Sequence, residues 1–163
     1  MPSEKWECLE IHSKDFEQRN NLIHDIVTLM RQLKKEKHVE SYFFNRYSNP
    51  KENTFFIKFG SVNSDEKGHS ELNDLLEKHP GIKDTKPYDC EMWKVDGVPI
   101  DQIKCVSCEL FEKIRDRFGK KITIKQAFYL LHFLMNQLGY SYKEEYRLYK
   151  TLEENIKRQL ETH

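Results

Sequence analysis

The chain has 163 residues, of which 37% are hydrophobic and 33% charged, and this length fits one domain with its own core. Lys plus Arg and Asp plus Glu number 27 each, so the zero net charge excludes a global basic field of the nucleic-acid-binding kind, though not a local basic patch. The 10 Phe, 8 Tyr and 2 Trp supply large buriable surface and argue against a disordered chain.

Neither the beginning of the chain nor its most apolar stretch predicts a membrane or secretory segment. The beginning, MPSEKWECLEIHSKD, has no apolar signal core. Residues 127–138 are the most apolar, but His132 and Asn136 interrupt them, and the stretch is too short to span a bilayer. We therefore expect a cytoplasmic protein with no membrane partner.

The first half of the chain predicts a strand, a helix and a hairpin. Residues 6–12 alternate as in a strand, and Ser13 is the expected N-cap of the helix that follows. This helix carries an apolar stripe that ends at Leu33. Residues 39–48 and 54–59 are rich in β-forming side chains, and the short turn between them predicts a hairpin.

A second helix and a fourth strand complete the predicted sheet. The helix begins at a cap formed by residues 64–65 and ends at about His79, before a Pro-Gly pair. The strand is expected within residues 82–95, most of it from Tyr88 onward. This order is β-α-β-β-α-β, which predicts the α+β class and a ferredoxin-like antiparallel sheet.

Three helices are predicted in the rest of the chain. The first occupies residues 101–118. Thr123 opens the second with a capping box, and Ser141 opens the third, which is long and charged. The sequence predicts no boundary between separate domains. We expect a single domain, residues 1–163, whose helical part, 98–163, packs on the sheet part, 1–97.

Cys105 and Cys108 form a CxxC pair inside a predicted helix. A structural zinc site needs two further ligands, and a redox pair normally follows a strand in a thioredoxin-like pattern. The sequence shows no second pair. We therefore interpret the two as ordinary helix cysteines and expect neither a metal site nor a cofactor.

His132 and Asn136 are four residues apart, so they share one face of a helix. A histidine in such apolar company is expected to be neutral unless an acid lies nearby, and a neutral ring can act as a general base. The alternative is a core histidine whose ring is hydrogen-bonded to the backbone or to Asn136.

The third predicted strand allows two further interpretations. Phe55, Phe56 and Phe59 resemble the stacking strand of RNA-recognition modules, but no Lys/Arg-Gly pair precedes them, so a core hairpin is favoured. Lys58 shares a strand face with Phe56, and Lys94 follows the fourth strand. Each lysine is either an anion-holding cation or a surface side chain whose stem covers apolar neighbours.

Three segments of the chain match one known pattern in the same order. Residues 42–59 contain YFFNRYSNP and TFFIKF, residues 88–97 read YDCEMWKVDG, and residues 130–139 read LLHFLMNQLG. Together they resemble the glutamate-elimination domain of lanthipeptide dehydratases and the related thiopeptide-type bacteriocin biosynthesis enzymes. The matched segments span most of the chain.

The resemblance implies a lyase-like reaction on a peptide. In that family the domain binds a peptide with a glutamylated Ser or Thr, removes the α-proton and expels glutamate. Two family arginines fall on Lys58 and Lys94, and the functional histidine falls on His132. Arg46 and Asn136 lie in the matched motifs and are expected to contact the peptide.

The chain also departs from the family pattern, so two functions stay open. One family arginine falls on Phe56, and lysine at the other two positions cannot grip a carboxylate with two parallel hydrogen bonds. The first function is glutamate elimination, with an activated peptide supplied by a partner protein. The second is a non-catalytic peptide- or protein-binding scaffold. The expected partners are a peptide, another protein or a second copy of the chain, with nucleic acid disfavoured.

Overall fold

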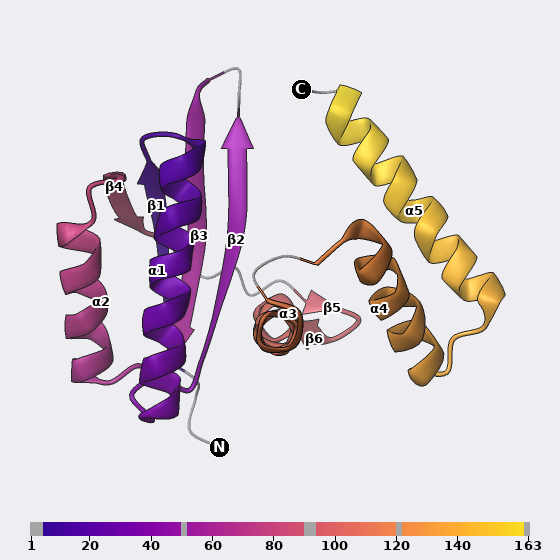
Figure 1. The fold of residues 1–163 in the computed structure, drawn as a ribbon, viewed down its shortest axis with the longest axis horizontal. Coiled ribbons are helices and arrows are strands. Elements are labelled where there is room, and N and C mark those ends of the chain that lie inside the picture. The colour runs from indigo at the N-terminus through magenta and orange to yellow at the C-terminus, as the bar shows by residue number, and fades with distance from the viewer. Residues whose placement is uncertain (1–4, 50–51, 90–93, 120–121, 162–163) are drawn as a thin grey trace. The chain divides into compact units, whose positions relative to one another are not determined.

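The structure, a computed structural model, describes residues 5–49, 52–89, 94–119 and 122–161. Within these ranges the chain forms five helices and a four-stranded antiparallel sheet, which confirms the predicted α+β class (Figure 1). The chain divides into two compact units, one ending at Phe111 and the other beginning at Glu112. The expected packing of the second unit on the sheet part stays a prediction.

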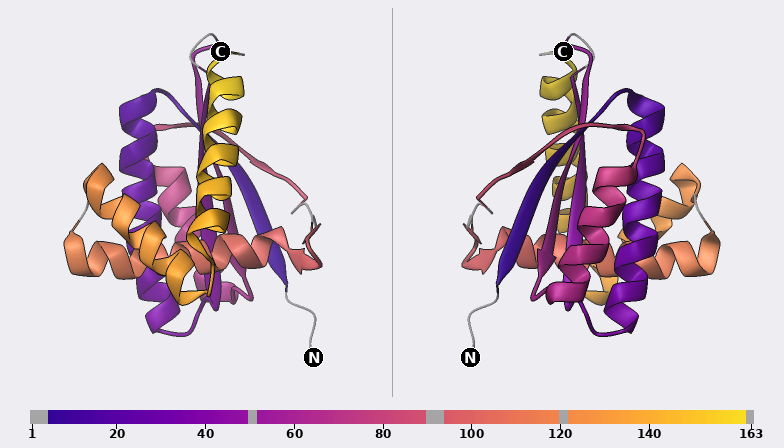
Figure 2. Two further views of the ribbon diagram at one scale, coloured as in Figure 1. Left: turned by 90° about the vertical axis from the view of Figure 1, so that its right-hand side faces the viewer. Right: turned by 90° about the vertical axis from the view of Figure 1, so that its left-hand side faces the viewer.

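The first unit contains the sheet. Its elements are β1 (Trp6–Ser13), α1 (Phe16–Lys35), β2 (Ser41–Asn49), β3 (Thr54–Val62), α2 (Glu66–Lys78) and β4 (Ile82–Pro87). The strand order is β2-β3-β1-β4, and each neighbouring pair is antiparallel. Helices α1 and α2 lie side by side on one face of the sheet (Figure 2). A short hairpin of β5 (Lys94–Val95) and β6 (Val98–Pro99) follows.

The prediction for the fourth strand is wrong in its position. β4 ends at Pro87, before Tyr88, where most of the strand was expected. It pairs with β1 from Ser13 to Leu9, and the last pair joins Leu9 to Pro87. Proline has no backbone N–H to donate to a ladder, so Pro87 is a natural place for the strand to end.

The cap of α1 also differs from the prediction. Asp15, not Ser13, is the N-cap, and its Oδ1 accepts a hydrogen bond of 2.8 Å from the backbone N of Gln18. Ser13 is instead the buried last residue of β1, and its Oγ donates to the carbonyl of Phe55 at 2.9 Å. A hydroxyl at the end of a strand can cap the following helix or bond to a neighbouring strand. Here the pairing of β1 with β3 selects the bond to the strand.

The main core lies between the sheet and the two helices. Alternate residues of the central strands point toward α1 and are almost fully buried, among them Ile11, Ile57 and Phe59. The apolar stripe of α1 meets them, and its members are Leu22, Ile23, Ile26, Val27, Met30 and Leu33. Burying a side chain of this size contributes about 1.5–3 kcal/mol, so this layer is the main stabilising contact of the unit.

A smaller cluster covers the opposite face of the sheet. Here Cys8 and Phe43 pack against Cys105 and Cys108 from the first part of α3 (Ile100–Phe118). Both α3 cysteines are buried packing residues, which agrees with their interpretation as ordinary helix cysteines. Among the described residues, no group of three or more His, Cys, Asp or Glu is placed to hold a metal ion.

Gly60 makes this second cluster possible. It lies opposite Phe43 in the β2–β3 register, and the ring of Phe43 lies across the space that a Cβ at position 60 would take. The same Cβ would stand 3.1 Å from the Sγ of Cys8. A residue with any side chain at this position would therefore displace the Phe43 ring or bend the sheet.

The second unit contains the end of α3, then α4 (Ile124–Gln137) and α5 (Tyr142–Glu161). The predicted capping box at Thr123 is confirmed: its Oγ1 accepts from the N of Gln126 at 3.1 Å, and its own N donates to Gln126 Oε1 at 2.8 Å. Gly139 follows α4 with φ of 85°, a left-handed conformation that glycine adopts without strain.

None of the helices in the described ranges is long and apolar enough to cross a membrane.

Candidate functional site

His132 lies on α4 and is held by a carboxylate of α5. Its Nδ1 is 2.8 Å from Oε1 and 2.9 Å from Oε2 of Glu145. The Glu145 residue is only 5% exposed, and the hydroxyl of Tyr149, one turn further along α5, donates a hydrogen bond to its Oε1. The three side chains form one connected group inside the second unit, joining α4 to α5.

These hydrogen bonds set the charge state of the group. The hydroxyl of Tyr149 lowers the pKa of Glu145, burial opposes this, and the hydrogen bond from His132 lowers the pKa further. The carboxylate in turn raises the pKa of Tyr149 to about 12, because it accepts the phenolic proton. Glu145 is therefore ionised and Tyr149 neutral at neutral pH.

The geometry also determines which ring nitrogen of His132 can accept a proton from a substrate. An ionised carboxylate only accepts hydrogen bonds. Nδ1 therefore carries the ring hydrogen and donates a hydrogen bond to Glu145. In the described part of the chain, Nε2 has no hydrogen-bond partner. The side chain is 23% exposed, between the rings of Phe128 and Tyr142, which stack on it at 6.3 and 5.9 Å.

A histidine oriented by a buried carboxylate is a common arrangement for proton transfer. The carboxylate holds the ring in one tautomer and supports the positive charge that the ring acquires when Nε2 takes a proton. The sequence placed Asn136 beside His132 but missed Glu145 and Tyr149. Asn136 is exposed one turn along α4, and the partner of the ring is the acid on α5. A Glu and a Tyr four apart on a predicted helix were the only signal available.

Lys58 lies on β3 in the first unit, on the sheet face opposite α1. Its Nζ is 5.6 Å from the ring centroid of Tyr47 and 5.0 Å from that of Tyr88. Both distances fit a cation–π contact, so two rings flank the ammonium group. The charge of Lys58 thus meets two aromatic faces, and both sequence interpretations, an anion-holding cation and a surface side chain, stay predictions.

Arg46 points to the other face of the sheet. It pairs with Ile57 of β3, whereas Lys58 pairs with Asn45, and neighbouring strand residues point to opposite faces. The guanidinium of Arg46 lies 5.4 Å from the ring centroid of Phe44. The structure therefore does not bring Lys58 and Arg46 together. Lys94 is the first residue of β5, and its side chain lies outside what the structure describes.

A row of stacked rings extends across the face that carries Lys58. His12 of β1 stacks on Phe56 at 5.0 Å, and Phe56 stacks on Tyr47 of β2 at 4.9 Å with an angle of 7° between the planes. Phe59, by contrast, is 1% exposed and belongs to the main core. The three phenylalanines of β3 therefore do not act together as a stacking strand.

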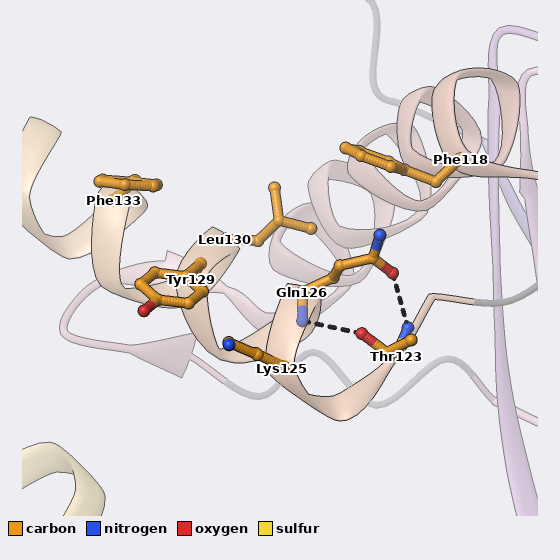
Figure 3. A pocket seen from close by; sticks show the side chains of 7 residues that line it. All are labelled: Phe118, Thr123, Lys125, Gln126, Tyr129, Leu130 and Phe133. Carbon is orange, nitrogen blue, oxygen red and sulfur yellow. Dashed lines mark hydrogen bonds between the residues drawn. The ribbon is translucent and has the colours of Figure 1, made fainter.

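A cavity is present in each unit. In the second unit a cavity of about 430 Å³ is lined mainly by apolar side chains of α4, with the Thr123–Gln126 hydrogen bonds at one end (Figure 3). In the first unit a cavity of about 600 Å³ lies along β1, and His69 there contacts Glu7, with Nδ1 2.7 Å from Oε2. His132 lines neither cavity among the described residues.

Comparison with family models, curated proteins and solved structures finds no match to this chain.

Proposed function

We propose that this chain is a cytoplasmic, peptide-binding domain of modified-peptide biosynthesis, built on a ferredoxin-like sheet, which eliminates glutamate from glutamylated Ser or Thr. The observation that carries the proposal is the His132–Glu145 pair, in which Nδ1 is engaged and Nε2 faces away from the carboxylate. The element order of the first unit, β1-α1-β2-β3-α2-β4 with strand order β2-β3-β1-β4, supports the fold assignment.

The proposed step is a β-elimination that needs one base. Nε2 of His132 takes the α-proton of the modified residue, and the electrons of that C–H bond form the Cα–Cβ double bond. The Cβ–O bond to glutamate breaks, and glutamate leaves as a carboxylate with the bonding electrons. Glu145 stabilises the imidazolium that forms. The resemblance assigns the holding of glutamate to Lys58 and Lys94 and contact with the peptide to Arg46 and Asn136.

The test is turnover of a synthetic peptide that carries one glutamylated Ser, followed by mass spectrometry. The wild-type chain should release glutamate and leave a dehydroalanine. His132→Ala should lower the rate about 10²–10⁴-fold, the usual contribution of a general base. His24→Ala is the matched control, because it removes an exposed histidine from α1 in the first unit. An active His132→Ala variant would overturn the assignment of the base.

A second candidate function is a non-catalytic peptide- or protein-binding scaffold. The observation that favours it is the amount of large apolar surface on α4 and α5, including Phe133 at 56%, Tyr146 at 61% and Ile156 at 55% exposure. Exposed apolar surface of this extent marks interaction sites more often than single exposed residues do. This function predicts peptide binding with no mass change, and equal affinity in the wild type and in His132→Ala.

A further inference from the structure

Arg19 is a buried cation in an unusual environment. It lies on α1, is only 4% exposed, and its Nη1 donates a hydrogen bond of 2.7 Å to the backbone carbonyl of Tyr47 on β2. Its Nε is buried and has no hydrogen-bond partner in the described part of the chain. The guanidinium lies 4.9 Å from the ring centroid of Phe16 and 6.0 Å from that of Phe55.

A second guanidinium lies on the same side of the sheet as the first, and its charge acts on it. Arg46 immediately precedes Tyr47, the residue whose carbonyl Arg19 contacts, and it points to the α1 side of the sheet with Phe44 and Tyr42. Burial lowers the pKa of Arg19, and the positive charge of Arg46 lowers it further. Partial loss of hydration also lowers the pKa of Arg46, although its side chain is exposed at the surface. Two like charges therefore share one end of the α1–β2 contact.

The described residues supply no carboxylate to this pair of cations. Arg19 has only a neutral carbonyl and two aromatic rings as partners, and Arg46 has the ring of Phe44. Buried charges in folded proteins are normally paired, because an uncompensated charge loses its hydration without replacement. The planar guanidinium fork fits the oxygens of a carboxylate or a phosphate better than any other ligand class.

We propose that Arg19 and Arg46 form a binding site for an oxyanion group, a carboxylate or a phosphate, at the N-terminal end of α1 beside β2. Arg46 is exposed and forms the rim, while Arg19 forms the floor. The ring of Phe16 lies over Arg19 and is 57% exposed, so it is the cover that an entering anion displaces. The site shares Arg46 with the proposed peptide contact, but it involves neither His132 nor the elimination step, so anion binding can be measured apart from turnover.

Binding is tested by calorimetric titration of the full chain with inorganic phosphate and, separately, with sodium acetate, at constant ionic strength. Binding of either probe is expected for the wild type, and which one binds tighter tells phosphate from carboxylate. Arg46→Gln should weaken it about 10- to 100-fold, the effect of losing a charge-assisted hydrogen bond. Arg147→Gln is the matched control, because it removes an exposed arginine from α5 and should leave the affinity unchanged.

A second measurement reports on the buried Arg19 without replacing it, so it does not depend on whether a variant at this position folds. The side-chain Nε–H resonance of Arg19 in a nitrogen–proton NMR spectrum should shift on addition of the tighter probe in the folded wild type. No binding of either probe, equal binding by the wild type and Arg46→Gln, or a titration that leaves the Arg19 resonance unmoved would each overturn the proposal.

Discussion

The Nδ1 of His132 lies 2.8 Å from Oε1 of Glu145, a residue 13 positions further along the chain and on a different helix. This contact, together with the hydroxyl of Tyr149, joins α4 to α5 through one buried carboxylate. The pair therefore has two consequences that can be measured separately, one for the stability of the helical unit and one for the chemistry of Nε2.

Glu145→Gln should change how stability depends on pH. The folded state lowers the pKa of Glu145 below its ordinary 4.5, so the carboxylate contributes stability above that pH and loses it as the pH falls through the folded pKa. The melting temperature of the wild type should therefore fall more steeply than that of Glu145→Gln below about pH 4.5. Glu161→Gln, an exposed change at the end of α5, is the control and should follow the wild type. Parallel curves for all three proteins would show that Glu145 is not stabilised by its partners.

Tyr149→Phe should remove one late step from the tyrosinate titration. The chain has 8 tyrosines, and the hydrogen bond to Glu145 raises the pKa of Tyr149 to about 12. A raised pKa means that this bond contributes its full stability below the ordinary value of about 10 and loses it as the pH rises through about 12. Ultraviolet absorbance of tyrosinate against pH checks this. Tyr146→Phe, one turn away and 61% exposed, serves as the comparison and should leave the late step in place.

How far the sequence could predict this protein depended on how local each signal was. The capping box at Thr123 involves residues within a few positions of one another, and it appears as expected. The cap of α1 was misplaced because Ser13 and Asp15 are equally good local candidates. Only the pairing of β1 with β3 decides between the two candidates, and it joins Ser13 to Phe55, 42 positions along the chain.

The candidate site was predicted less well, for the same reason. His132 was singled out from its apolar neighbours, but the acid that orients it comes from the next helix and has no sequence pattern of its own. Strand alternation could have shown that Arg46 and Lys58 point to opposite faces, yet this needed the β2–β3 register. Arg19 has the spacing of an ordinary helix residue, and only its burial distinguishes it.

Gly60→Ala should destabilise the first unit by about 1–3 kcal/mol, because the new methyl group enters the space of the Phe43 ring. Urea unfolding followed by circular dichroism gives the free energy of unfolding. A matched test is the double variant Gly60→Ala with Phe43→Leu. Removing the ring removes the collision, so the double variant should be more stable than the sum of the two single changes indicates. Additive effects would show that the ring is not what Gly60 accommodates.

Thr123→Ala should weaken the start of α4 by about 0.5–2 kcal/mol, since it removes the oxygen that accepts from the N of Gln126. Helicity and unfolding free energy, both from circular dichroism, are the measurements. Thr151→Ala is the control, because Thr151 lies inside α5, where its hydroxyl bonds to the carbonyl of Arg147 and caps nothing. A loss of stability as large in Thr151→Ala as in Thr123→Ala would argue against the capping explanation.

Lys58→Met should destabilise the sheet by about 0.5–2 kcal/mol, because it keeps the apolar stem but removes the charge between two aromatic rings. Lys86→Met on β4 provides the comparison, since its Nζ lies 3.1 Å from Oδ2 of Asp84 and its side chain is 64% exposed. Urea unfolding of both variants measures the difference. Equal free energies of unfolding for the two variants would mean that the rings around Lys58 stabilise its charge no better than water does.

The division of the chain inside α3 has a practical consequence for cutting the protein into parts. The boundary between the units falls between Phe111 and Glu112, near the middle of one continuous helix, so neither unit ends at a loop. Proteases act on exposed loops and spare helix interiors, so a limited digest would release fragments whose ends do not coincide with the units. Expression of residues 1–111 alone would leave the last carbonyls of the shortened helix without partners. Any study of the separate units should therefore keep α3 whole in both pieces.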